Sequence, residues 1–388
     1  MLSACSVLLA ACVCVTAGTA SDTVHARLTA TIGDDAPSTP FLLGEVSGLA
    51  VDDAGRVYVS DFQDPRIVVF APDGRHLATI GRKGKGPGEF IAPTGPVIAP
   101  DGSLWVRNMS EFAHFVVDAK TRLPTKFDRA VTGPALAPWR SKRPSFLDRA
   151  NRFYFPRSFG GADGLVHNRY LRYTLVGNLL DSLTVPLFST TRAGWASIMV
   201  SARGGRMIPG LNIVPFHPLP VWAVTPAGAL ISGPADKYEL NEAGPDGRTI
   251  RTIVRAVRAI PIPPAVRAES LRALKRRIDT LPVPIASVHG VSDEVRALRL
   301  PDNFPFYRGL SVDPGNGDLW VWRWTSDSGP AQSVVDVFSS AGRYVRTVVL
   351  PANCATEPSP VVRRKTIACL QLDPESGAEF VVIAQLGR

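Results

Sequence analysis

Short runs of apolar residues alternate with polar turns along most of this chain. Between Gly44 and Gly81, four runs rich in β-branched and aromatic residues are separated by segments that contain Asp, Pro or Gly. Asp-x-Gly and Asp-Gly are typical of tight turns between antiparallel strands. The pattern therefore predicts a four-stranded antiparallel meander, which needs neighbouring sheets to bury both of its faces. The four runs are GLAVD, RVYVSD, RIVVF and HLATIG.

The second run of this unit, a turn residue followed by a β-rich stretch, recurs along the chain. Asn can replace Gly at such a turn because it also tolerates a positive φ angle. The first two intervals between copies are 47 and 49 residues, which are typical of propeller blades. The later intervals are longer, so we expect insertions there. The six turn residues are Gly55, Gly102, Asn151, Gly228, Gly317 and Gly377.

The repeats predict an all-β fold, a six-bladed β-propeller of four-stranded antiparallel blades with one inserted helix. The last copy ends near Arg388 after about two strands, and the N-terminal run His25–Gly33 matches the end of the first unit. We expect this N-terminal strand to pair in the last blade and so close the ring, which removes exposed sheet edges. The propeller is predicted to span 21–388, with blades at about 44–81, 90–128, 140–186, 217–262, 304–350, and 366–388 plus 23–33.

One segment has the periodicity of a helix. It begins with proline and places Leu271, Leu274, Ile278 and Leu281 on one face, opposite a basic face. Binding to a membrane surface and packing against the propeller are both compatible with this pattern. We expect packing, as a helical insertion over 263–281.

The first twenty residues contain no charged side chain and are mostly small or apolar. This composition predicts a signal peptide over 1–20, with cleavage after Ala20. The protein is then exported, either periplasmic or extracellular. The alternative is a lipid anchor at Cys12, because LAAC resembles a lipobox. No other stretch comes close to a membrane span, so we expect none.

Two cysteines, Cys354 and Cys369, lie outside the predicted signal peptide. A single pair in an exported protein predicts a disulfide. Two unpaired buried thiols are the alternative.

The chain carries a formal net charge of +9, mostly through scattered arginines. Such a charge can attract an anionic polysaccharide, lipid headgroups or nucleic acid, or it can simply be solvated surface. No recognisable nucleic-acid-binding motif accompanies it. We therefore expect no nucleic-acid partner, and we expect a monomer. The short basic clusters are Arg82–Lys85, Arg140–Arg143, Lys275–Arg277 and Arg363–Lys365.

The first two units resemble NHL repeats. The likeness extends through GKGPGEF at Gly84–Phe90 and the Pro-x-Gly of Pro93 to Gly95. Later units are similar to exported bacterial proteins known only as six-bladed propellers. The resemblance implies a propeller fold and export. Propellers of the NHL type mostly bind proteins, RNA or glycans, and some related six-bladed propellers are enzymes, among them gluconolactonase-like metal hydrolases and an amidating lyase.

These observations predict an exported, non-enzymatic binding module that recognises a protein, peptide or glycan through one face of the ring, without a cofactor. The alternative is a metal-dependent hydrolase or lyase of the gluconolactonase-like kind, with one divalent cation, Ca²⁺ or Zn²⁺. For this alternative the resemblance supplies one matching position, Glu45.

No catalytic residue is predicted. The candidate ligand-binding residues are Glu45, His217 and Arg308, each next to the start of a predicted innermost strand, and Trp324, near the end of the stretch WVWRW. Trp320 and Trp322 of the same stretch are expected to be buried between blades. The charged pair of Asp61 and Arg66 is expected to be structural.

Overall fold

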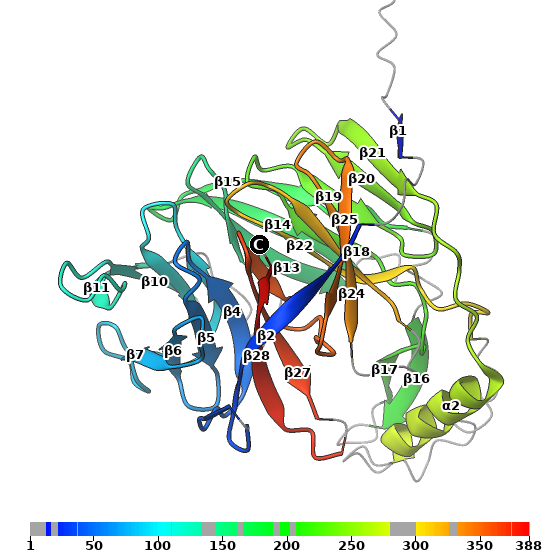
Figure 1. Cartoon of the computed structure of the whole chain (residues 1–388), viewed down its shortest axis with the longest axis horizontal. Coiled ribbons are helices and arrows are strands. Elements are labelled where there is room, and N and C mark those ends of the chain that lie inside the picture. Colours follow the sequence, from blue (N-terminus) through cyan, green and yellow to red (C-terminus); the bar gives the residue numbers. More distant parts are fainter. Residues whose placement is uncertain are drawn as a thin grey trace, which may run out of the picture.

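In a computed structural model the chain is an all-β propeller, and the residues that the structure describes include one helix (Figure 1). Its strands form a series of antiparallel meanders, as the alternation of apolar runs and turns predicts. The structure describes residues 13–16, 22–36, 38–109, 111–132, 145–160, 166–188, 195–201, 207–279, 300–325, 332–373 and 375–387.

Three four-stranded sheets follow one another in the first half of the chain. In each sheet the spatial order of the strands equals their order in the sequence. The first contains β4 (Val46–Val51), β5 (Val57–Asp61), β6 (Arg66–Phe70) and β7 (His76–Ile80). The second contains β8 (Pro93–Ile98), β9 (Leu104–Asn108), β10 (Glu111–Val116) and β11 (Lys126–Thr132). The third contains β12 (Phe146–Leu147), β13 (Arg152–Gly160), β14 (Val166–Thr174) and β15 (Leu179–Thr184).

A fourth meander follows after an insertion. The long interval before it contains a hairpin of β16 (Trp195–Ser201) and β17 (Met207–Ile213). The meander consists of β18 (Val221–Val224), β19 (Leu230–Gly233), β20 (Glu239–Ala243) and β21 (Thr249–Arg255). The short strand β1 (Val13–Thr16) adds to β21 in parallel. The rest of the predicted signal peptide lies outside the described residues.

The remaining strands form one nine-stranded sheet. The long strand β2 (Thr23–Gly33) lies at its centre, beside β28 in Figure 1. Its first residues pair in parallel with β25, and Ala26–Ile32 pair antiparallel with β28. The other members are β3 (Thr39–Pro40), β22 (Tyr307–Val312), β23 (Leu319–Arg323), β24 (Ser333–Phe338), β25 (Tyr344–Leu350), β26 (Val361–Arg363), β27 (Thr366–Leu372) and β28 (Glu379–Leu386).

The N-terminal run thus pairs with the C-terminal strand, as the sequence match suggested. The C-terminal part of the chain differs from the prediction in one respect. Strand β26 lies before residue 366, where the last blade was expected to begin. It is only three residues long and follows a proline-rich segment, so it has no alternation that sequence reasoning could detect.

All six turn residues singled out in the sequence have left-handed φ angles, from 56° at Asn151 to 85° at Gly228. Each turn is closed by a backbone hydrogen bond, as in Asp52 N–H to Arg56 O at 3.1 Å and Asp148 N–H to Arg152 O at 3.1 Å. The repeated Gly or Asn is therefore required by backbone geometry, because most other residues are strained at positive φ.

The hydrophobic core is divided among the spaces between neighbouring sheets. One cluster joins the first two sheets through Tyr58, Ile67 and Leu104, and the next joins the second and third through Trp105 and Phe153. Further clusters continue around the molecule until β4–β6 pack against β27 and β28. The second strands of the meanders, such as β5, β9 and β19, are thus buried on both faces.

The expected structural roles of several side chains are confirmed. Asp61 is fully buried, accepts backbone N–H groups of Gly44 and Glu45, and lies 3.5 Å from the Arg66 guanidinium. Trp320 and Trp322 are both buried.

The predicted disulfide between Cys354 and Cys369 is present, with a sequence separation of 15 residues. Both cysteines are buried in the cluster shared by β23–β25 and β27–β28.

The helix α2 (Pro264–Asp279) lies at the lower right of Figure 1, outside the sheets. Leu274 is buried, and Arg267 donates a hydrogen bond to the Leu300 carbonyl oxygen at 3.1 Å. The short bridge between Pro261 and Asn303 holds the beginning of the helix next to the segment that leads into β22.

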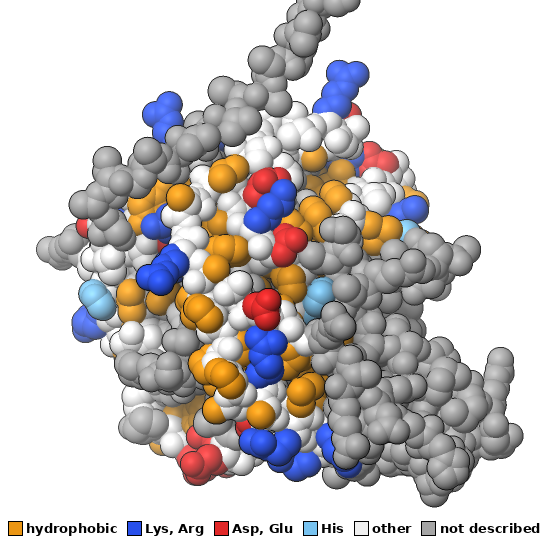
Figure 2. Space-filling model, turned by 90° about the vertical axis from the view of Figure 1, so that its right-hand side faces the viewer, with side chains coloured by type: hydrophobic (Ala, Val, Ile, Leu, Met, Phe, Trp, Pro, Cys, Tyr) orange, Lys and Arg blue, Asp and Glu red, His pale blue; other side chains and the backbone are white. Residues whose placement is uncertain are grey.

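Charged side chains are dispersed over the side of the molecule shown in Figure 2, where basic and acidic groups alternate. Several of the basic clusters are also paired with acids. Arg82 binds Glu89, Arg276 binds Glu269, and Arg363 binds Asp53. The cluster at Arg140–Arg143 lies outside the described residues.

Candidate functional site

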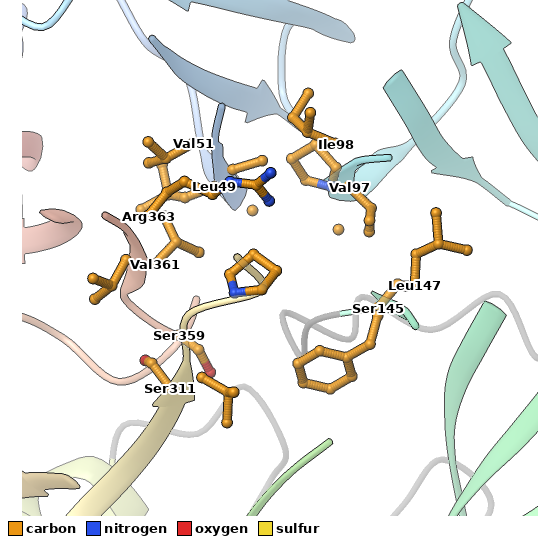
Figure 3. A pocket seen from close by; sticks show the side chains of 18 of the residues that line it. Leu49, Val51, Val97, Ile98, Ser145, Leu147, Ser311, Ser359, Val361 and Arg363 are labelled. Atoms are coloured by element: carbon orange, nitrogen blue, oxygen red, sulfur yellow. The ribbon is translucent and has the colours of Figure 1, made fainter. Parts of the chain in front are cut away.

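A cavity of about 120 Å³ lies where six strands meet. Strands β4, β8, β18 and β22 contribute their C-terminal parts, β18 and β22 also contribute residues that follow them, and β12 and β26 contribute their whole length. We call this space the channel cavity. Apolar side chains from different sheets make up most of its wall in Figure 3, among them Leu49, Val51, Val97, Ile98, Leu147 and Val361.

One charged side chain lines the channel cavity. Arg363, the last residue of β26, is only 8% exposed, and its Nε donates a hydrogen bond to Asp53 Oδ1 at 2.7 Å. This hydrogen bond and the positive charge hold the pKa of Asp53 below its usual value. Asp53 also lies 3.3 Å from Nε of Arg364, so two arginines share one carboxylate.

Three serine hydroxyl groups in the wall differ in their hydrogen bonding. Ser311 is fully engaged: it donates to the Pro360 carbonyl oxygen at 2.5 Å and accepts from Trp322 Nε1 at 2.9 Å. Ser145 is only 6% exposed, and its hydroxyl has no hydrogen-bond partner among the described residues. Ser359 is half-buried in the opposite wall. Ser145 therefore keeps an unused polar group at the channel cavity.

The candidate residues from the sequence lie at the other end of these strands. Glu45 directly precedes β4, His217 lies shortly before β18, and Arg308 is the second residue of β22. Because the opposite ends of β4, β18 and β22 converge on the channel cavity, none of these residues lines it. Trp324 follows β23, which is antiparallel to β22, so it lies beside the start of β22. We call the surface around Glu45, His217, Arg308 and Trp324 the start face.

The start face contains a cluster of three aromatic rings. Trp324 stacks on Phe304 with ring centroids 5.8 Å apart and an interplanar angle of 17°. Phe216, next to His217, meets both rings edge-on at 5.8 Å and 5.1 Å. Phe216 has a φ angle of 58°, unusual for a bulky residue. The rings come from three separate segments, so sequence reasoning found Trp324 but missed Phe216 and Phe304.

Arg308 is held within the start face by polar neighbours. One Nη donates to Ser333 Oγ at 3.1 Å and lies 3.4 Å from Asn353 Oδ1. Ser333 also accepts the backbone N–H of Cys354, so the disulfide region supports this arginine. Glu45 precedes β4 and His217 precedes β18, so these two candidates belong to different sheets from Arg308 in β22.

A metal site needs several ligands to converge. Within the described parts of the chain, no three His, Cys, Asp or Glu side chains form a group that could hold a metal ion. The metal-dependent alternative rests on Glu45 alone and stays a prediction.

Arg363 was noticed in the sequence only as part of a basic cluster. Nothing in the local pattern distinguishes it from Arg364, whose side chain is 67% exposed. Arg363 is the last residue of β26, whereas Arg364 lies in the turn that follows and has a φ angle of 56°. A strand of three residues is too short for its end to be read from the sequence.

Comparison with known proteins supports the fold and leaves the activity open. A family model described as a 6-bladed beta-propeller matches residues 38–105. A search of the curated proteins found no match.

Solved structures that resemble this chain have low identities and low TM-scores. Virginiamycin B lyase from Staphylococcus aureus shares 12% identity at a TM-score of 0.38, covering 86% of this chain and 93% of the lyase. Regucalcin from Agrobacterium tumefaciens, a calcium-binding protein, shares 14% at 0.35, covering 95% and 98%. Aldose sugar dehydrogenase from Streptomyces coelicolor, in its PQQ-bound form, shares 12% at 0.40, covering 93% and 97%. These values assign no function to this chain.

The described part of the chain contains no helix with the length and hydrophobicity that crossing a membrane requires.

Proposed function

We propose that this protein is an exported, non-enzymatic binding module, built as a six-bladed propeller, that binds a protein, peptide or glycan through the start face. The observation that carries the proposal is the cluster of Phe216, Phe304 and Trp324 at the beginning of the innermost strands.

The six-bladed ring is supported by the strand pairing. If the nine-stranded sheet is divided at β2, it yields two four-stranded units, β22–β25 and β26–β28 with β2. These join the four other meanders to make six. The hydrophobic clusters between successive sheets form a closed series on the same division. Pairing of β2 with β28 then closes the ring and leaves no free edge at the junction.

Export is supported by the disulfide, because such bonds persist in oxidising compartments. We propose cleavage after Ala20, with a lipid anchor at Cys12 as the alternative. Both positions lie outside the described residues. Cleavage would remove β1, which is a fifth strand added to a complete four-stranded meander. We also propose that the protein is a monomer.

Aromatic and arginine side chains carry much of the energy of protein and peptide recognition. The start face offers both, since Arg308 lies at the start of β22 and Trp324 lies beside it. Trp324 is half-buried and already stacked, so little conformational entropy is lost when a ligand covers it. This arrangement favours a peptide or protein ligand, and a glycan stacked on the ring is the other outcome to be tested.

The test is to screen the immobilised protein against a random peptide display library and a glycan array. Trp324→Ala should weaken binding of any selected ligand by about 30-fold, the size of a hot-spot residue worth about 2 kcal/mol. Ile250→Ala is the matched control, because this exposed apolar residue lies on β21, outside the start face.

Equal binding by wild type and Trp324→Ala would contradict the proposed site. Selection of glycans alone would identify the ligand as a glycan. Failure of both screens would count against a binding module of this kind.

A further inference from the structure

We propose that the channel cavity is a binding site for a small organic carboxylate with an apolar group about the size of a benzene ring, held by Arg363. This site lies at the opposite end of the innermost strands from the start face, and it does not depend on the function proposed above.

The size and wall of the channel cavity define the apolar part of the ligand. An engineered cavity of about 150 Å³ in another protein binds benzene, and the channel cavity measures about 120 Å³. Leu49, Val51, Val97 and Ile98 form one part of its wall, from two neighbouring sheets (Figure 3). A compact ring or a short branched chain fits this volume, whereas a polymer does not.

The guanidinium of Arg363 defines the charged part of the ligand. A guanidinium carries five N–H donors, and the Nε donor is used by Asp53. Among the described residues the side chain of Arg363 bonds Asp53 through Nε, which leaves the Nη1 and Nη2 groups for a ligand. They present a fork whose geometry matches the two oxygen atoms of a carboxylate. In Figure 3 this side chain extends from β26 to the vicinity of Leu49, at the edge of the cavity.

The surroundings of Arg363 leave room for an additional negative charge. Its partner Asp53 is shared with Arg364, and the buried Asp313 accepts the backbone N–H groups of Gly315 and Arg364. On its other side Arg363 lines a surface groove that also contains Arg27, Arg364 and Lys365, with the two carboxylates of Asp53 and Asp73. A small anion that approaches along this side meets mainly positive charge.

The unused hydroxyl of Ser145 is a second, independent indication of a ligand. Buried hydroxyl groups in proteins are nearly always hydrogen-bonded, and this one has no partner among the described residues. Figure 3 places Ser145 and Arg363 on different sides of the channel cavity. A ligand that reaches both sides would satisfy both polar groups, with its apolar part between them.

The test is isothermal titration calorimetry of the purified protein with benzoate, isobutyrate and acetate. Benzamide and benzylamine serve as controls, because they keep the ring but replace the carboxylate with a neutral or a cationic group. We expect benzoate or isobutyrate to bind at least tenfold more tightly than acetate, and benzoate at least tenfold more tightly than either control.

Two variants identify the site. Arg363→Gln should weaken binding of the preferred carboxylate at least tenfold, whereas Arg364→Gln should change it less than threefold. Val97→Phe should abolish binding by filling the cavity while leaving the hydrogen bond between Arg363 and Asp53 in place. Ser145→Ala should have a smaller effect, about threefold. Thermal unfolding of each variant checks that it is folded.

The proposal is overturned if none of the three carboxylates binds, or if benzamide binds as tightly as benzoate. Full binding by both Arg363→Gln and Val97→Phe would also overturn it, because the ligand would then lie elsewhere. If Arg363→Gln fails to fold, Val97→Phe and the comparison with benzamide decide the question. Trp324→Ala should bind the carboxylate normally, so failure at one site is distinguishable from failure at the other.

Discussion

The two ends of the innermost strands are built in different ways. At the start face, three aromatic rings from the segments around Phe216, Phe304 and Trp324 pack mainly on one another. At the channel cavity, regular strands from all the meanders contribute small and medium apolar side chains around Arg363. The first surface rests on residues that lie outside the regular strands, whereas the second is formed by the strands themselves.

This difference determines what each end can recognise. A surface made of connecting segments can change without disturbing the sheets, so it suits a ligand that is large and specific. A cavity formed by packed strands has a fixed size, and a change of one side chain alters both its volume and the stability of the core. We therefore expect substitutions at the start face to change ligand binding with little loss of stability. Substitutions in the wall of the channel cavity should change both.

The largest expected effect comes from comparing two tryptophans of the same stretch. Trp322 is fully buried, and its Nε1 donates to Ser311 in the wall of the channel cavity. Trp322→Ala should cost about 3–5 kcal/mol of the free energy of unfolding, because it leaves a large void. Trp324→Ala, at the half-buried start face, should cost roughly 1 kcal/mol. Chemical denaturation measures both values.

Similar losses for the two variants would show that the start face is as much a part of the core as the cavity wall. The two ends of the innermost strands would then not differ in how much they contribute to the core. Trp322→Ala should also weaken binding of the carboxylate, since Ser311 loses a partner that holds it in place.

The next largest effect is expected from the disulfide, which closes a loop that runs from the neighbourhood of Arg308 at the start face to β26 at the channel cavity. Cys354 lies next to Asn353, a neighbour of Arg308, and the loop closed by the bond contains β26 with Arg363. Replacement of both cysteines by serine should lower the free energy of unfolding by about 3 kcal/mol on the chain-entropy model. Binding of the carboxylate should weaken, whereas binding that depends on the aromatic cluster should be retained.

Denaturation and calorimetry of the double variant, with the wild type in reducing buffer as a second sample, check this expectation. Loss of ligand binding at the start face, with carboxylate binding unchanged, would reverse the assignment of the loop to the channel cavity.

The sequence predicts the repeated architecture well because the repeat is enforced locally. Each copy needs a residue that accepts positive φ at its turn, and Asn151 satisfies this need as the glycines do. The burial of Asp61 and of Trp322 follows from the same alternation. These features depend on neighbours in the sequence, so one sequence is enough to find them.

The candidate sites are harder to predict because they depend on distant segments. Phe216 and Phe304 contact Trp324 from other segments of the chain. The channel cavity collects a few residues from each of six strands, and no local pattern marks them. Arg363 illustrates the limit, since it ends a strand only three residues long and Arg364 already lies in the turn that follows.

The smallest expected effect is a pH dependence of the turns at the end of the strands that line the channel cavity. After β12, Asp148 accepts hydrogen bonds from Arg152 Nε at 2.7 Å and from the Tyr154 hydroxyl at 2.8 Å. The same group is present after β4, where Asp52 accepts from Arg56 and Tyr58. This set at positions i, i+4 and i+6 stabilises the turns beside the cavity.

Burial, assisted by the hydrogen bond to Asp148, raises the pKa of Tyr154 to about 12. In the unfolded chain a tyrosine titrates near pH 10. The unfolded state therefore loses this proton first, so stability is complete below about pH 10 and falls as the pH rises towards 12. For Tyr154 the loss is on the order of 2–3 kcal/mol.

Tyr154→Phe should be less stable at neutral pH and should show a shallower decline of stability between pH 10 and 12, as measured by urea denaturation. If stability falls as steeply with pH in Tyr154→Phe as in the wild type, other buried tyrosines control the alkaline response. One of them is Tyr307 near the start face, whose pKa is also raised by burial. The turns at the cavity end would then not be its weakest point.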